Sequence, residues 1–166
     1  GNYIGVDPTG TTALPNQSSG IELQGTNRNL IGGDEEGAGN LISGNGRNGI
    51  FLSEGDEQGQ GYPPSSENRI IGNTIGLNAA GDAPLPNLQH GIHIFSFGEA
   101  PVFATEVRDN LVSGNRQHGI KLDGELVQRN TLRGNRIGVD ATGLVAIANN
   151  LDGIHPDQSS INTIGG

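Results

Sequence analysis

The sequence contains no cysteine, methionine or tryptophan, and it has a single lysine, Lys121, among its 166 residues. The absence of cysteine excludes disulfides and thiolate metal sites. Eighteen aspartates and glutamates outnumber nine lysines and arginines, which gives a formal net charge of −9 at pH 7. We therefore expect no binding to nucleic acid and none to an anionic membrane surface, because neutralising phosphate requires basic residues.

Large apolar groups are also scarce. Only 32% of the residues are hydrophobic and 4% are aromatic, and no apolar run approaches the length that spans a membrane, so we expect no membrane insertion. A compact globule with so few apolar side chains would struggle to offset the entropy of its chain. The sequence has instead 29 glycines and short, regularly spaced clusters of Ile, Leu and Val, which favour a repeat architecture.

A Gly-Ile pair recurs along the chain and opens a short alternating segment each time. The pairs begin at Gly20, Gly49, Gly91, Gly119 and Gly153. Alternation with a period of two predicts strands. The residues predicted to point inward are Ile21 and Leu23, Ile50 and Leu52, Ile92 and Ile94, and Ile120 and Leu122. Those predicted to point outward are Glu22, Phe51, His93, Lys121 and His155.

Two further families of segments lie between these strands. Members of one family begin with Asn, carry an apolar residue at the third position and end with Asn or Asp. Their first residues are Asn2, Asn40, Asn73, Asn110 and Asn135. The other family comprises "NLIGG" at 29, "NRIIG" at 68, "NTLRG" at 130 and "NTIGG" at 162, with a degenerate copy, "VFATEV", between 95 and 109. Each unit therefore predicts three short strands separated by turns.

Strands this short bury a face when they wind as successive coils. Each coil then stacks on the next at about 4.8 Å, and the inward Ile, Leu and Val side chains form a continuous narrow core. Asparagine side chains one coil apart can hydrogen-bond as a ladder. We predict such a structural ladder along the first positions, Asn2, Asn40, Asn73, Asn110 and Asn135.

These segments resemble the right-handed parallel β-helix repeats of pectate-lyase-like proteins. The strings "GNYIGVDPTGT" and "GNLISGN" in particular resemble tandem repeats of large secreted bacterial surface proteins. The resemblance covers nearly the whole chain. It implies an all-β fold, a right-handed parallel β-helix of about five coils of three short strands with uncapped ends. It also implies a secreted protein, extracellular or at the cell surface. That fold carries lyases, epimerases and adhesins, so the resemblance does not choose among functions.

The Gly-Ile pairs divide the chain into coils at 20–48, 49–90, 91–118 and 119–152. The remaining pieces, 153–166 and 1–19, together match one coil in size. We therefore expect 153–166 and residues 1–19 of a neighbour to form a shared coil. Two interpretations stay open: identical chains stacked head to tail as a filament, or a slice of a longer polypeptide with neighbouring repeats.

One predicted site is a calcium site at the junction between neighbours. We align the last residues of the Asn-initiated segments in one column, Asp140, Asp7 of the next copy, Asn45, Asn78 and Asn115. Stacked carboxylates repel unless a cation lies between them. The hydroxyls of Thr9 and Thr142 add oxygen ligands of the kind that Ca²⁺ accepts. The alternative is that Asp7 and Asp140 form turns through bonds to backbone amides.

Acidic residues also cluster at 34–36 and 54–57. We expect solvated loops there, with peripheral calcium as the alternative. The insertion 53–67 is predicted to project sideways and to make lateral contacts.

The histidines predict two arrangements on the first strands. His90, His118 and Asp152 fall in one column and could hold Zn²⁺. His93, Lys121 and His155 fall in another column next to Asp123, where a sugar acid could bind with Lys121 as base. The alternative for both sets is exposed polar residues on a solvated strand face.

We expect a structural subunit or segment of an extracellular filament or surface adhesin rather than an enzyme. Its partners would be further copies or repeats of itself, with polysaccharide as another candidate. The alternative is a carbohydrate-binding domain, or a lyase or epimerase of acidic polysaccharides. Against catalysis stand the single lysine and the negative net charge, which opposes a polyanionic substrate.

Overall fold

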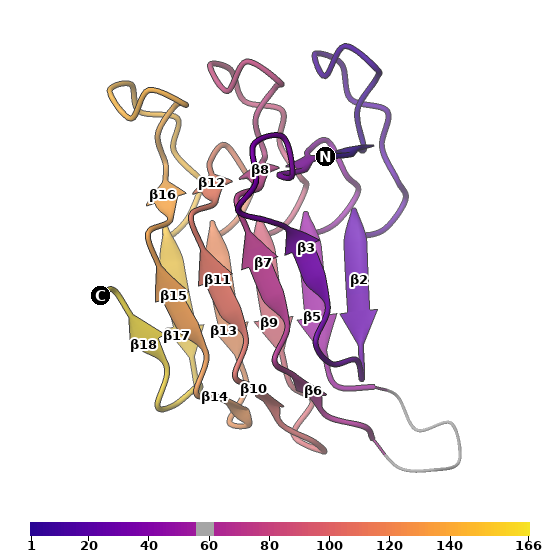
Figure 1. Ribbon diagram of the computed structural model, residues 1–166, viewed down its shortest axis with the longest axis vertical. Coiled ribbons are helices and arrows are strands. Elements are labelled where there is room, and N and C mark those ends of the chain that lie inside the picture. Colours follow the sequence, from indigo (N-terminus) through magenta and orange to yellow (C-terminus); the bar gives the residue numbers. More distant parts are fainter. Residues whose placement is uncertain (56–61) are drawn as a thin grey trace.

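The computed structural model describes residues 1–55 and 62–166, and short β-strands wound into stacked coils make up these two segments (Figure 1). Within them, no helix is long and apolar enough to cross a membrane. All paired strands run parallel, and successive strands of one coil enter different sheets. The fold is a right-handed parallel β-solenoid.

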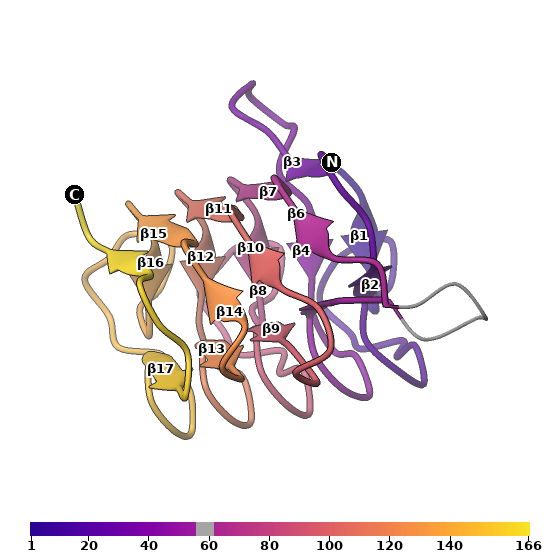
Figure 2. The same cartoon turned by 90° about the horizontal axis from the view of Figure 1, so that it is seen from below.

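Three five-stranded sheets run along the solenoid. The first sheet contains β2 (Ile21–Gln24), β5 (Ile50–Ser53), β9 (Ile92–Phe95), β13 (Ile120–Asp123) and β17 (Ile154–Asp157). The second contains β3 (Leu30–Gly32), β7 (Arg69–Ile71), β11 (Glu106–Arg108), β15 (Thr131–Arg133) and β18 (Thr163–Ile164). The third contains β1 (Tyr3–Ile4), β4 (Leu41–Ile42), β8 (Thr74–Ile75), β12 (Leu111–Val112) and β16 (Arg136–Ile137). Figure 2 shows the stacked coils from a second side.

The prediction of three strands per coil is too low for three of the coils. A fourth, short sheet lies between the first and second sheets and contains β6 (Ser65–Ser66), β10 (Val102–Phe103) and β14 (Val127–Gln128). The degenerate segment between 95 and 109 holds both β10 and β11. Its repeat pattern is weak because Thr105 stands where the other segments of this family begin with asparagine.

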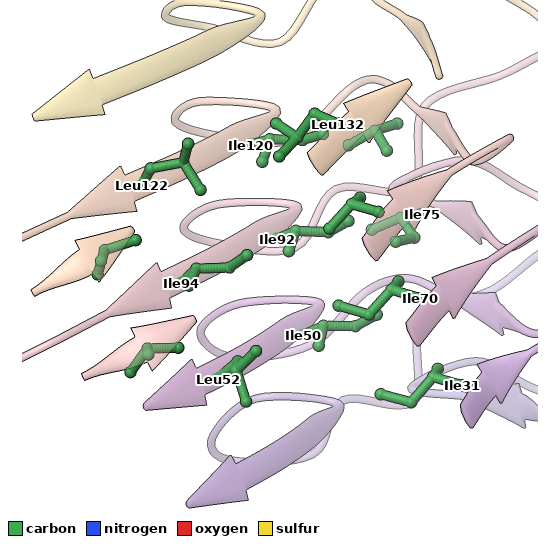
Figure 3. Close-up of a cluster of buried hydrophobic side chains, with 14 of the residues drawn as sticks. Ile31, Ile50, Leu52, Ile70, Ile75, Ile92, Ile94, Ile120, Leu122 and Leu132 are labelled. Carbon is green, nitrogen blue, oxygen red and sulfur yellow. The ribbon is translucent and has the colours of Figure 1, made fainter. Parts of the chain in front are cut away.

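The core is one narrow aliphatic column. Residues at equivalent places pair in register, so Ile92 lies between Ile50 and Ile120, and Ile94 lies between Leu52 and Leu122. These six side chains are fully buried (Figure 3). The predicted inward positions are thereby confirmed. Burial decreases toward both ends, where Ile21, Leu23 and Ile154 are only partly covered. Within the described residues, the first and last coils are thus less covered than the central ones.

The predicted asparagine ladder, here the first ladder, is confirmed. The amide nitrogen of Asn2 donates to Asn40 Oδ1 at 3.0 Å, and Asn40 donates to Asn73 Oδ1 at 2.9 Å. The same bonds connect Asn73 to Asn110 and Asn110 to Asn135, each at 3.0 Å. Backbone N–H groups of the same residues donate to the same oxygens. Each oxygen therefore satisfies two donors of the preceding coil.

Two further ladders were not predicted. The second ladder runs through Asn16, Asn45, Asn87, Asn115 and Asn149, with amide bonds of 2.9 Å throughout. The third ladder consists of Asn29, Asn68, Asn130 and Asn162, with Thr105 between its two halves. A signal for the second ladder was present in the sequence, because an asparagine precedes each Gly-Ile pair by four residues.

Long loops follow alternate strands of the third sheet, at 5–16, 76–87 and 138–149, and project from the same side (Figure 1). Each is closed by an isolated antiparallel bridge, such as that between Val6 and Ala13. Neighbouring loops contact each other: Ala79 N–H donates to Gly10 O at 2.9 Å, and Ala141 N–H donates to Gly81 O at 2.8 Å. Each loop therefore fills the axial space of two coils.

The loops overturn the predicted column of last residues. Asn45 and Asn115 belong to the second ladder on coils without a long loop. Asp7, Asn78 and Asp140 instead open the three loops, where each accepts hydrogen bonds from its own loop. The alignment failed because the loops insert residues between the strand and the ladder asparagine.

Candidate functional site on the first sheet

The outward face of the first sheet carries the polar and aromatic side chains. Strand pairing places Lys121 directly between His93 and His155, and Phe51 next to Glu22 and His93, as the sequence predicts. The residues two positions further along form a second outward row with Phe95, Asp123 and Asp157. The structure therefore gathers groups from several coils on one face.

Lys121 lies at the centre of a charged cluster. Its Nζ is 2.8 Å from Asp123 Oδ2 and 3.6 Å from Asp157 Oδ2. His93 Nε2 lies 3.4 Å from the same oxygen of Asp123. Burial opposes the ionisation of Asp123, but its bonds to Lys121 and His93 outweigh burial and lower the pKa of the carboxyl. The predicted base is thus held in ion pairs with two carboxylates.

Aromatic rings border this cluster. Phe95 stacks on Phe51 at 6.3 Å between ring centroids and meets Phe97 edge to face at 4.6 Å. A shallow groove of about 190 Å³ runs over Phe51, His93 and Phe95 and is edged by Glu22 and Arg47. Sequence reasoning placed Phe51 outward but did not extend the row to Phe95, which the same alternation also turns outward.

His90 and His118 lie just before strands of the first sheet and form a column. Their side chains accept backbone N–H groups from the next coil, as the ladder asparagines do. His90 N–H donates to Asn48 Oδ1 at 3.2 Å, and His90 Nδ1 accepts the N–H of His118 at 3.3 Å. His118 Nδ1 in turn accepts the N–H of Asp152 at 3.1 Å. Burial lowers the pKa of His90 to about 3 and also lowers the pKa of His118. Neutral rings are required here because Nδ1 must accept.

The predicted zinc set is only partly assembled. His90 stacks on His118 with 5.2 Å between ring centroids, but it is not part of the cluster of possible ligand atoms. His155, which the sequence had grouped with Lys121, joins His118 and Asp152 instead. The ligand atoms of these three residues lie within 4.8 Å of one another, and the two imidazoles stack at 4.2 Å.

The candidate calcium ligands are engaged within their own loops. Asp7 accepts the Thr9 hydroxyl at 2.7 Å and the Thr11 N–H at 2.9 Å. Asp140 accepts the Thr142 hydroxyl at 2.8 Å and the Leu144 N–H at 3.1 Å. These bonds, led by those from the threonine hydroxyls, lower the pKa of both carboxyls. They are the contacts that the turn-forming alternative predicts.

The acidic cluster at 34–36 is exposed, as expected for a solvated loop, whereas Glu54 of the second cluster is not. Asp34 forms a bidentate pair with Arg108, with distances of 2.6 and 2.8 Å, and so connects the loop after β3 to β11 of the second sheet. Glu54 is buried, with 1% of its surface exposed, and its Oε1 accepts the Ser96 hydroxyl and the Phe97 N–H. Residues 56–57, and the part of the predicted lateral insertion from 56 to 61, lie outside the described residues.

One comparison with known proteins decides the family. A family described as the right-handed beta helix region matches residues 6–165, which is nearly the whole chain. The chain belongs to this family. No curated protein and no solved structure matches the sequence. The right-handed β-helix family includes enzymes and proteins without enzymatic activity. Membership therefore establishes the fold, and the function must be argued from the residues of the site.

Proposed function

We propose that this right-handed β-helix is a structural segment of an extracellular filament or surface adhesin, extended lengthwise by further coils. The observation that carries the proposal is the direction of the ladders. In the first ladder, each asparagine donates through its backbone and amide nitrogens to the next residue toward the C-terminus. One end of the solenoid therefore presents acceptors, and the other presents donors.

The open ends support a lengthwise partner because they are complementary. Asn2 and Asn16 present ladder oxygens at the end formed by β1 and β2, and Asn135 and Asn149 stand at the other end of the same ladders. Incompletely covered aliphatic side chains accompany them, including Ile21 on β2 and Ile164 on β18. An added coil would pair with these edges through backbone hydrogen bonds, as in other cases of strand addition.

The loops set a condition on that partner. Neighbouring loops two coils apart are already in hydrogen-bond contact, so loops on adjacent coils would collide. Direct stacking of an identical chain would place its loop 5–16 one coil away from loop 138–149. Pro8, moreover, occupies the place of the donors Ala79 and Ala141 and has no N–H to give. We therefore favour a neighbouring repeat whose coil at the junction lacks the long loop.

Electron microscopy and the mass of the polypeptide isolated from its source test this proposal. We expect an elongated particle outside the cell, with stacked strands that give an axial spacing of about 4.8 Å in fibre diffraction. We also expect coils without the long loop to flank the chain. A compact intracellular monomer of 17.1 kDa would contradict the proposal. Calcium is not needed for it, because Asp7 and Asp140 are satisfied within their loops.

A second candidate function is binding or cleavage of an acidic polysaccharide. The observation that favours it is the groove over Phe51, His93 and Phe95 beside Lys121 and Asp123. Aromatic rings can pack against sugar rings, while Lys121 could pair with a uronate carboxylate. Lys121 is paired with two carboxylates, which favour its charged form, so it is less suited to act as a base.

Incubation with pectin and alginate distinguishes the two candidates. For a structural segment, we expect no unsaturated product absorbing in the ultraviolet. Elimination activity that Lys121→Ala abolishes, in a variant with an unchanged circular dichroism spectrum, would establish the second candidate. Binding without turnover, lost in Phe51→Ala, would instead establish a carbohydrate-binding role for the same groove.

A further inference from the structure

We propose that His118, Asp152 and His155 form a binding site for a divalent transition-metal ion, with Zn²⁺ as the expected ligand. The three residues come from two neighbouring coils. His118 lies two residues before β13, Asp152 lies two residues before β17, and His155 is on β17. Backbone hydrogen bonds hold the two segments together, including that from Gly119 N–H to Asp152 O at 2.9 Å. The site therefore spans a boundary between coils.

The distances approach those of a tetrahedral zinc site. Asp152 Oδ2 is 3.2 Å from His118 Nδ1 and 2.7 Å from His155 Nδ1. Bonds of about 2.0–2.2 Å to a tetrahedral zinc ion separate ligand atoms by roughly 3.3 Å. The first distance already fits this value. The second requires the His155 ring to rotate outward, and its side chain is 37% exposed and has room to do so.

The contact between His118 and Asp152 brings two acceptors together. His118 Nδ1 accepts the backbone N–H of Asp152, so this nitrogen carries no hydrogen that could point to the carboxylate 3.2 Å away. A cation between the two lone pairs converts this repulsive contact into an attractive one. When the metal binds the Nδ1 lone pair, the Asp152 N–H loses its acceptor. Because Asp152 is exposed, this N–H can bond to water instead.

The ligand set selects the class of metal. Two imidazoles and one carboxylate suit Zn²⁺, Cu²⁺ and Ni²⁺, whereas Ca²⁺ and Mg²⁺ prefer sites built from oxygen alone. Asp152 and His155 face solvent, so a water molecule can complete the fourth position. The ion would link two coils near one end of the solenoid, where burial of the core decreases, and would stabilise the folded chain by mass action.

The test is calorimetric titration of the metal-free chain with ZnCl₂, accompanied by thermal melting. We expect one equivalent of Zn²⁺ to bind and the melting temperature to rise with zinc concentration, while CaCl₂ and MgCl₂ at the same concentrations have no effect. Titration with CoCl₂ should give the visible absorption of a tetrahedral cobalt site. The variants His155→Ala and Asp152→Asn should each lose affinity by more than about tenfold, since even supporting residues of metal sites cost that much.

His93→Ala is the matched control. His93 occupies the same outward row as His155, two coils away, and it bonds to Asp123 rather than to the cluster. We expect this variant to bind Zn²⁺ as the unaltered chain does. The absence of zinc binding by the unaltered chain would overturn the proposal. Retention of full affinity in the double variant Asp152→Asn with His155→Ala, or its loss in His93→Ala, would overturn it as well.

Discussion

The second and third ladders pass through corners of the same solenoid, but only the second is continuous. In the second ladder, Asn87 accepts from Asn45 and donates to Asn115, both at 2.9 Å. In the third, Thr105 stands where an asparagine would connect Asn68 to Asn130. The strands that follow, β7, β11 and β15, nevertheless stay in register. The core and the sheets therefore set the register, and the ladders add stability to it.

The largest effect is expected from cutting the continuous ladder at its centre. Asn87 is fully buried, accepts from both nitrogens of Asn45 and donates to Ile42 O. Asn87→Ala leaves several buried groups without partners, so we expect a loss of about 3 kcal/mol in the free energy of unfolding. Urea denaturation measures it. Asn2→Ala, at the exposed end of the first ladder, should cost less than about 1 kcal/mol. Equal losses would show that burial does not set the strength of these bonds.

A buried polar group that connects a single pair of coils sharpens the same comparison. Glu54 Oε1 accepts from Phe97 N–H at 2.7 Å, while its Oε2 is buried without a partner among the described residues. Glu54→Leu removes the acceptor and should destabilise the fold by about 2 kcal/mol.

Glu54→Gln is the matched control for this change. It keeps the acceptor oxygen and removes a buried charge, so we expect it to be neutral or to stabilise the fold by up to about 1 kcal/mol. Thermal and urea unfolding of the two variants compare them. A glutamine variant as unstable as the leucine variant would show that the charge itself is needed.

Repair of the interrupted ladder should stabilise the protein. Thr105 is buried, and its hydroxyl oxygen has no hydrogen-bond partner among the described residues. Thr105→Asn supplies an oxygen for the donors of Asn68, and we expect about 1 kcal/mol of added stability. Thr131→Asn, on the outward face of β15 in the next coil, is the control and should not stabilise. A destabilised Thr105→Asn variant would mean that the corner has lost the space for asparagine.

The ladders also show how much of the fold the sequence could predict. Core positions such as Ile92 and Leu122 followed from alternation alone, and the first ladder followed because its asparagines begin similar strings. The second ladder was missed because its members Asn16, Asn87 and Asn149 follow loops of variable sequence. Counting backward from Gly-Ile, rather than forward from the strand, would have found it.

The candidate site was less predictable for a different reason. Alternation placed His93 and Lys121 on one face, but it could not say which neighbour each side chain would choose. His155 approaches Asp152, three residues earlier in its own coil, rather than Lys121 beside it. The partner of His155 depends on the rotation of its imidazole ring. The burial of Glu54 depends on its contacts with Ser96 and Phe97, at a corner that occurs once among the described residues. Neither is encoded by the repeat.

The smallest effect concerns ion pairs that span the interrupted ladder. Glu106 lies next to Thr105 and pairs with Arg69 at 3.2 Å and with Arg133 at 2.7 Å, on the two coils that the third ladder fails to connect. Burial raises the pKa of Glu106, but the bonds from Arg133 and Arg69 outweigh it and hold the pKa below the ordinary value of 4.5. Because the folded-state pKa is lowered, this contribution is present above pH 4.5 and is lost as the pH falls through the folded-state value.

Glu106→Gln tests that contribution by thermal melting across pH. At pH 7 we expect a loss of about 0.5 kcal/mol, since these pairs are partly exposed. The difference from the unaltered chain should shrink below pH 4.5, where the carboxylate begins to protonate, and also in high salt, which screens exposed charges. Glu35→Gln, in the exposed acidic loop, serves as the control at each pH. If the loss in Glu106→Gln persisted unchanged at low pH, the side chain would act through packing, and the ion pairs would not compensate for the missing asparagine.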